Sequence, residues 1–226
     1  AVADFHECDE ARAILRTPEF RIRLEGLRAS ELVDYAGVAA LKLPMLEMLF
    51  HHFCKQHLKP GSERAKEFRA FQDREGKRLY QHALFEALQE YFHKQDTDVW
   101  GWPAWPEAFH RPESLEVQEF ATQYRDRIEF FSFLQWQADI QLSAVGWRSL
   151  ELELGVGLYL DLAGSVDGGG AESWANQTLY AINVGIGATP ELNNQLGQDW
   201  GLPPFVPDRL REAAYAPFIA MLRHNM

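Results

Sequence analysis

Apolar residues recur at helical spacing up to about residue 150, so this part of the chain is predicted to be mainly helical. Thr17 is an N-cap residue and Pro18 suits the first helical position, which together predict a helix start. The turn at 59–62 ends one helix and caps the next, so residues 63–93 are expected to form one long helix or two consecutive ones. Residues 128–147 are apolar on more than one side, which predicts a helix packed between layers.

Two features interrupt this helical pattern. Pro44 should kink or end its helix, because a proline inside a helix removes a hydrogen bond and clashes with the preceding turn. After residue 150, Gly, Asn and Pro become frequent, and residues 156–162 are apolar almost throughout, with Asp161 near the end. Such a run is typical of a parallel strand covered on both faces, so 156–162 is predicted to be the main buried strand. A helix, a buried strand and a long loop in this order favour one unit of an α/β barrel.

Asp161 lies near the end of the predicted strand, before a loop that is rich in Gly, Pro and Asn and runs to Phe205. Barrel enzymes place their chemistry at the C-terminal ends of strands, although a turn-forming or capping acid is an equally good interpretation of Asp161. Loops longer than ~12–15 residues are usually functional or disordered. Because this one contains Trp174, Tyr180 and Trp200, simple disorder is the poorer interpretation.

Three tryptophans, Trp100, Trp102 and Trp105, and two prolines lie within residues 98–106. They could form an apolar platform on which a sugar ring stacks, or they could clamp the helical part onto its neighbour. We favour the clamp, because a tryptophan seldom stays exposed without a partner.

Composition excludes several classes of function. The 226 residues carry a net charge of −11 with a pI near 5.2, which argues against a nucleic-acid partner. No apolar run approaches the length of a membrane span and the first residues lack a signal pattern, so the protein is expected to be soluble and cytoplasmic. Cys8 and Cys54 are expected to be reduced thiols. His51 and Cys54 share a helix face, as zinc ligands could, but no second ligand pair follows, so no metal and no cofactor is predicted.

Four blocks in the second half of the chain resemble the 4-α-glucanotransferases, also called amylomaltases or disproportionating enzymes. The blocks are GLYLDLA at 157–163, AESWAN at 171–176, GATPE at 187–191 and GQDWGLPP at 197–204. Their order and spacing are more specific than any one block. Residues 31–36 with Lys42 resemble a segment of the bacterial members, and residues 133–139 and 214–218 resemble family segments, so the resemblance covers nearly the whole chain.

This resemblance implies an enzyme that cuts an α-1,4 bond in a maltooligosaccharide, holds the donor piece covalently and passes it to another glucan. The retaining mechanism uses two carboxylates ~5–5.5 Å apart, one as nucleophile and one as acid and then base. The family's nucleophilic Asp stands in an Arg-x-Asp-His motif just beyond a helix like 208–226, so both catalytic carboxylates are expected beyond Met226. No catalytic residue is assigned within the chain.

The expected fold is therefore α/β, an incomplete (β/α)8 TIM-barrel fragment that is mostly helical. Residues 1–128 are expected to be a helical subdomain region, and residues 129–226 the barrel helix, strand, glucan-binding loop and following helix. Such a fragment should be inactive alone, and it should either self-associate through its unpaired strand or rearrange that strand. A non-catalytic glucan-binding module and a helical scaffold remain alternatives.

The resemblance also implies residues that bind maltooligosaccharides. Asp161 matches an acid that supports the sugar subsite next to the cleavage point, and Trp200 matches an indole of the loop that folds over the glucan. The full set of substrate-binding candidates is Asp161, Trp174, Asn176, Glu191, Gln198 and Trp200. Trp174 and Trp200 could instead pack the loop. The sequence departs from the family pattern at Thr189, Glu191 and Asp199, which makes the contact of Glu191 the least supported of the set.

Overall fold

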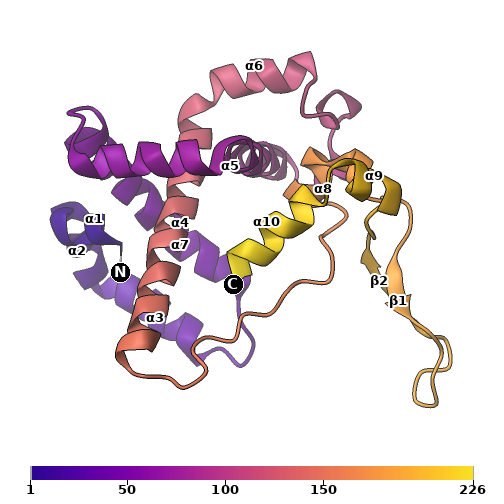
Figure 1. Ribbon diagram of the computed structural model, residues 1–226. Coiled ribbons are helices and arrows are strands. Elements are labelled where there is room, and N and C mark those ends of the chain that lie inside the picture. The colour runs from indigo at the N-terminus through magenta and orange to yellow at the C-terminus, as the bar shows by residue number, and fades with distance from the viewer. Residues whose placement is uncertain (1, 226) are drawn as a thin grey trace. The chain divides into compact units, whose positions relative to one another are not determined.

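The computed structural model describes residues 2–225 and is mostly helical, as predicted (Figure 1). Its helices are α1 (Ala3–Glu7), α2 (Asp9–Arg16), α3 (Pro18–Ala29), α4 (Tyr35–Phe53), α5 (Glu63–Gln95), α6 (Leu115–Gln123), α7 (Arg125–Glu151), α8 (Ala171–Ala175), α9 (Pro207–Glu212) and α10 (Ala216–Asn225). Shorter helical segments are η1 (Cys54–Leu58), η2 (Trp102–Ala104), η3 (Glu107–Phe109) and η4 (Gln177–Leu179), and the strands are β1 (Ile186–Ala188) and β2 (Gln198–Leu202).

The chain divides into two compact units. Unit 1 comprises Ala1–Gly76 and Ser132–Val145, and unit 2 comprises Lys77–Phe131 and Gly146–Met226. These limits differ from the expected boundary at residue 128, because α5 and α7 are long helices that each contribute to both units. The division into a helical subdomain and a barrel part stays a prediction about the fold of the whole protein. No helix among residues 2–225 combines the length and apolarity that crossing a bilayer requires.

Unit 1 is built around the ring of Phe53 at the end of α4. Its centroid lies 5.1 Å from that of Phe133 and 5.5 Å from those of Phe68 and Trp136, so α4, α5 and α7 share one aromatic core. Phe53, Phe68 and Phe133 have no exposed surface. Such aromatic pairs contribute about 0.5–1.5 kcal/mol each beyond their area burial. The predicted packing of residues 128–147 between layers is confirmed up to Gln137 but is wrong for the rest of the segment, where Ile140, Leu142 and Trp147 are exposed.

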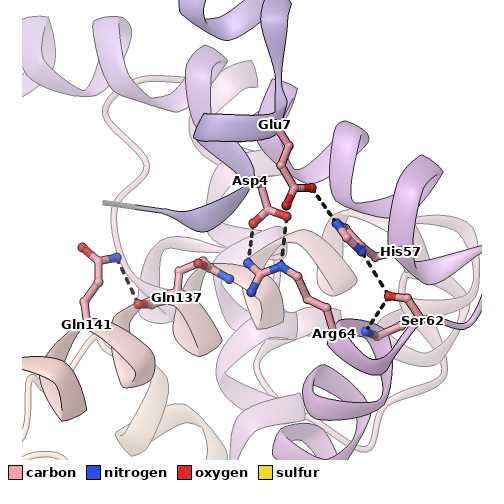
Figure 2. Close-up of polar contacts among 8 residues, drawn as sticks. Asp4, Glu7, His57, Ser62, Arg64, Gln137 and Gln141 are labelled. Atoms are coloured by element: carbon pink, nitrogen blue, oxygen red, sulfur yellow. Dashed lines mark hydrogen bonds and ion pairs between the residues drawn. The ribbon is translucent and has the colours of Figure 1, made fainter.

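A polar cluster joins α1 to the start of α5 in unit 1 (Figure 2). The carboxylate of Asp4, which is fully buried, accepts two hydrogen bonds from Arg64, at 3.2 and 2.5 Å. The Arg64 guanidinium also lies 4.7 Å from the centroid of Trp136. His57 bridges the side chains of Glu7, at 3.1 Å, and Ser62, at 3.0 Å. Pairing and stacking leave no charge of the Asp4–Arg64 pair uncompensated.

The capping residues Thr17 and Ser62 correctly predict where two helices begin. The Thr17 hydroxyl accepts from Phe20 N at the start of α3, and α5 begins directly after Ser62, as the turn at 59–62 predicts. The prediction for residues 63–93 is also confirmed, with a break inside α5 at Gly76, whose φ of 55° and ψ of −134° suit only glycine. Pro44, however, lies inside α4 and does not end it.

Unit 2 has its core where the tryptophan-rich segment meets α5 and α8. Trp102 and Trp105 are buried, and the ring centroid of Trp105 lies 5.0 Å from that of Phe85 and 5.9 Å from that of Trp174. Trp102 Nε1 donates to Gly168 O at 3.0 Å. The clamp predicted for this segment is therefore confirmed for two of its indoles, whereas Trp100 is 71% exposed.

The prediction of a buried strand at 156–162 is wrong for this structure. The segment is irregular and exposed, with Val156 at 93% and Tyr159 at 87% exposure. A parallel strand needs hydrogen-bonded neighbours, and no strand within residues 2–225 pairs with this segment. The expected helix at 208–226 is also interrupted, because Ala214 and Tyr215 take positive φ values of 49° and 58° between α9 and α10.

Candidate functional site

The long loop of unit 2 contains an antiparallel hairpin, β1–β2, which extends away from α8 and α9 (Figure 1). Ala188 pairs with Gln198 and Gly187 with Asp199. A Cβ at Gly187 would lie 1.9 Å from Gln198 O, so only glycine permits this pairing. Gly197 has a φ of +70°, and a Cβ there would lie 2.7 Å from Ala188 O. Two glycines of the GATPE and GQDWGLPP blocks are thus required by the close approach of the strands.

Gln198 and Trp200 are two residues apart on β2, so their side chains lie on the same face of the hairpin. Trp200 Nε1 donates to Gln198 Oε1 at 2.8 Å, which fixes the indole relative to the strand. The Trp200 side chain is nevertheless 53% exposed. The pair therefore offers an apolar ring face beside the amide NH₂ of Gln198, and a sugar presents matching apolar faces and hydroxyls.

Glu191 lies in the loop that joins the two strands. Its backbone exchanges two hydrogen bonds of 3.0 Å with that of Asn194, which closes a tight turn and leaves the Glu191 side chain exposed. Leu192 and Leu196 in the same loop are almost fully exposed. The loop at this end of the hairpin thus carries an accessible carboxylate and two exposed leucines.

Two of the predicted binding residues lie at α8 rather than on the hairpin, Trp174 in the core of unit 2 and Asn176 at the C-cap of the helix. Trp174 in α8 has no exposed surface, and its Nε1 donates to Phe109 O at 3.0 Å. A sugar cannot stack on a fully buried indole, so Trp174 packs the loop, which is the alternative that the sequence left open. Asn176 donates its amide to Glu172 Oε1 at 3.0 Å.

The two ends of the hairpin segment meet beside α8. The rings of Tyr180 and Phe205 stack with centroids 4.7 Å apart and an interplanar angle of 25°. Backbone hydrogen bonds join Ala181 N to Pro204 O at 2.9 Å and Val206 N to Leu179 O at 2.8 Å. Burial, followed by the nearby Glu172 carboxylate, raises the pKa of the Tyr180 hydroxyl above its usual range. The sequence marked Tyr180 only as a large aromatic of the loop.

Asp161 is exposed in the irregular segment that follows α7. Within the described residues, no hydrogen bond joins its carboxylate to the hairpin. The structure therefore brings Gln198 and Trp200 into contact and places Glu191 on the same hairpin. In the part of the chain that the structure describes, Asp161 is not bonded to any of these three residues. Residues 2–225 contain no group of three or more His, Cys, Asp or Glu side chains arranged to hold a metal ion.

The family model and two related proteins that match this chain carry the same description. A family model for 4-alpha-glucanotransferase matches residues 8–226. A 4-alpha-glucanotransferase of Haemophilus influenzae is 32% identical, over 99% of this chain and 32% of its own length. That of Mycobacterium bovis is 38% identical over 156 residues, which are 69% of this chain and 21% of the relative. The chain therefore spans a third or less of the length of these relatives.

Solved structures agree in fold. Amylomaltase from Corynebacterium glutamicum is 29% identical with a TM-score of 0.65, over 94% of this chain and 29% of that one. Amylomaltase from Streptococcus agalactiae in complex with acarbose has a TM-score of 0.67 at 22% identity, over 91% of this chain and 43% of that one, and supports the fold alone. Because the family model matches almost every residue of the sequence, this chain belongs to the 4-alpha-glucanotransferase family.

Proposed function

We propose that the protein containing these residues transfers α-1,4-glucan segments between maltooligosaccharides by a retaining double displacement. The observation that carries this proposal is the family match over residues 8–226. The exposed indole of Trp200, fixed against Gln198, supports it as a surface suited to a sugar ring. In this mechanism one carboxylate forms a covalent glycosyl-enzyme and another acts as acid and then as base. We place both carboxylates outside the 226 residues.

In this proposal the β1–β2 hairpin covers the glucan. Trp200 supplies the apolar face for a glucose ring, while Gln198 donates to a hydroxyl and Glu191 accepts from one. Hydroxyls buried against the protein need such partners, because each unpaired polar group costs about 1–3 kcal/mol. Asp161 would support the sugar subsite next to the cleavage point. For this role, other strands of the whole protein must fix the position of residues 156–162.

We also propose that residues 156–162 become a strand of a (β/α)8 barrel in the whole protein. Val156 and Tyr159 are almost fully exposed, and Leu158, Leu160 and Leu162 are each more than a third exposed. An exposed apolar run of this kind is a ready site for pairing with other strands. Without those strands, the 226 residues alone should be inactive and should self-associate through this segment.

The test is a disproportionation assay on the complete protein that the gene encodes. Maltotriose is the substrate, and the expected products are glucose and longer maltooligosaccharides. Trp200→Ala should weaken donor binding, whereas Trp100→Ala removes an indole that is also exposed, at 71% against 53%, but lies outside the hairpin, and it serves as the control. Binding of maltooligosaccharides without glucose release would favour a non-catalytic binding module, and indifference to glucans would favour a helical scaffold.

A cytoplasmic location is part of the proposal. It is supported by the free thiols of Cys8 and Cys54. Fractionation of cells that express the complete protein tests it, and recovery outside the cytoplasm would contradict it.

A further inference from the structure

Strand β2 contains a β-bulge at Trp200, the exposed indole of the hairpin. Asp199 pairs with Gly187, and Leu202 pairs with the residue of β1 directly before Gly187. The two residues between these pairs, Trp200 and Gly201, therefore have no partner on β1. A bulge bends its strand and changes the direction of the side chains that it carries. The direction of the Trp200 indole thus depends on how this bulge is held.

The bulge needs a left-handed backbone at Gly201. Its φ is +64°, which glycine adopts at no steric cost and most other residues seldom adopt. A Cβ at this position would meet no heavy atom within 4 Å. Gly201 is therefore required by the backbone conformation of the bulge and not by close packing.

The side chain of Asp199 bonds across Trp200 to the far side of the bulge. Asp199 Oδ1 accepts a hydrogen bond of 2.9 Å from Gly201 N, the amide that directly follows Trp200. A bond from an Asp side chain to the backbone two residues on forms a local turn. Trp200 Nε1 in turn donates to Gln198 Oε1 at 2.8 Å. The backbone around Trp200 is thus held by Asp199, and its ring is held by Gln198.

Space for the Asp199 carboxylate is left by Gly185, which lies just before β1. A Cβ at Gly185 would lie 3.0 Å from Asp199 Cγ and closer still to Oδ1. An alanine at this position would therefore displace the carboxylate from Gly201 N. The bond that holds the bulge thus depends on a glycine that is distant from it in the sequence.

We propose that Asp199, Gly201 and Gly185 are positioning residues, which set the direction of the Trp200 indole so that its face meets a glucose ring of the glucan. This inference rests on the proposed function, in which Trp200 binds the glucan. None of the three is proposed to touch the reacting atoms. Binding to a side chain that is already held in place avoids the entropy cost of ordering it in the complex.

The decisive variant is Asp199→Ala in the complete protein, because it removes the bond to Gly201 N. We expect the KM for maltotriose to rise about three- to tenfold, with kcat changed less than about twofold. Asp199→Asn keeps an oxygen that can accept from Gly201 N, so its KM should stay within about twofold of the unaltered value. Asp96→Ala is the matched control, because Asp96 Oδ1 accepts the same type of bond from Asp98 N, at 3.0 Å, outside the hairpin. The control should change neither value.

Double variants test whether these residues act together and through the indole. Adding Asp199→Ala to Trp200→Ala should raise the KM no further, because no indole is left to position. Gly185→Ala should raise the KM as Asp199→Ala does. Combining Gly185→Ala with Asp199→Ala should exceed neither single effect, because both remove the same bond.

Hydrogen exchange measures the bulge without turnover. Peptides that contain residues 198–202 should exchange faster in Asp199→Ala, which frees the amide of Gly201, and in Gly201→Ala, which strains the left-handed backbone. The same peptides should exchange as slowly in Asp199→Asn as in the unaltered protein, because the acceptor is kept.

The outcomes separate the positioning role from the proposed function. An unchanged KM or unchanged exchange in Asp199→Ala would overturn the positioning role. Asp199→Asn with the raised KM of Asp199→Ala would also overturn it, because the charge of the carboxylate would then act on the sugar directly. A further rise in KM when Asp199→Ala is added to Trp200→Ala would have the same meaning.

A loss of kcat with KM unchanged in Asp199→Ala would overturn the positioning role as well, because it would place Asp199 in the chemistry. Absence of glucose release by the unaltered protein refutes the proposed function. In that case the exchange rates still decide whether Asp199 and Gly201 hold the bulge.

Discussion

Replacing Trp174 and replacing Trp200 should have opposite effects on stability and substrate binding, although the sequence indicates both as sugar-binding candidates. Trp174 has no exposed surface and donates to Phe109 O, whereas Trp200 is 53% exposed and its Nε1 donates to Gln198 Oε1, two residues away on β2. Replacing Trp174 by Phe removes one buried hydrogen bond, leaves a carbonyl unpaired and opens part of the indole volume. We expect a loss of about 2–4 kcal/mol in the free energy of unfolding.

For Trp200→Phe, the same chemical change at an exposed site should alter the free energy of unfolding by less than about 0.5 kcal/mol. The assay is urea unfolding of the complete protein and both variants, paired with KM for maltotriose. We expect Trp174→Phe to lower the unfolding midpoint and leave KM unchanged, and Trp200→Phe to raise KM and leave the midpoint unchanged. A Trp174→Phe protein of unaltered stability with a raised KM would refute the packing role that the structure gives this residue.

Three further predictions follow from other parts of the chain. Gly101→Ala should destabilise unit 2 by about 1–3 kcal/mol in urea unfolding, because φ is +80° and the new Cβ would lie 3.0 Å from Gly169 O. Asp4→Ala should cost about 3–5 kcal/mol by leaving the Arg64 guanidinium without its buried partner, and a loss below 1 kcal/mol would contradict this. Burial raises the pKa of Glu86, so its carboxyl favours folding below the unfolded pKa and loses that contribution as pH rises through the folded pKa. Glu86→Gln should therefore stabilise the protein in urea unfolding at pH 8 and have little effect near pH 4.

The features predicted correctly from the sequence depend on neighbours in the chain. Thr17 caps α3 with its own hydroxyl, and Ser62 does the same at the start of α5, so capping residues suffice to place these helix starts. The burial of Trp102 and Trp105 was also predictable, because a large indole usually packs against a partner, although the same reasoning is wrong for Trp100, which is exposed.

The features that sequence reasoning missed depend on distant partners. Residues 156–162 have the composition of a buried strand, but a strand forms only where another strand pairs with it. Within residues 2–225, β1 and β2 pair with each other and no strand pairs with this segment. Tyr180 and Phe205 lie on either side of the β1–β2 segment in the sequence, and their rings stack in the structure. No local sequence pattern predicts this contact. Two similar tryptophans in one loop differ in role because only the three-dimensional packing decides which one is buried.

The most direct test of the account is the release of glucose from maltotriose by the complete protein and by its Trp200→Ala variant. The account predicts glucose release with longer maltooligosaccharides as co-products, and a rise of about tenfold in KM when the exposed indole of the hairpin is removed. A folded, complete protein that releases no glucose, or a Trp200→Ala variant with the KM of the unaltered protein, would contradict it.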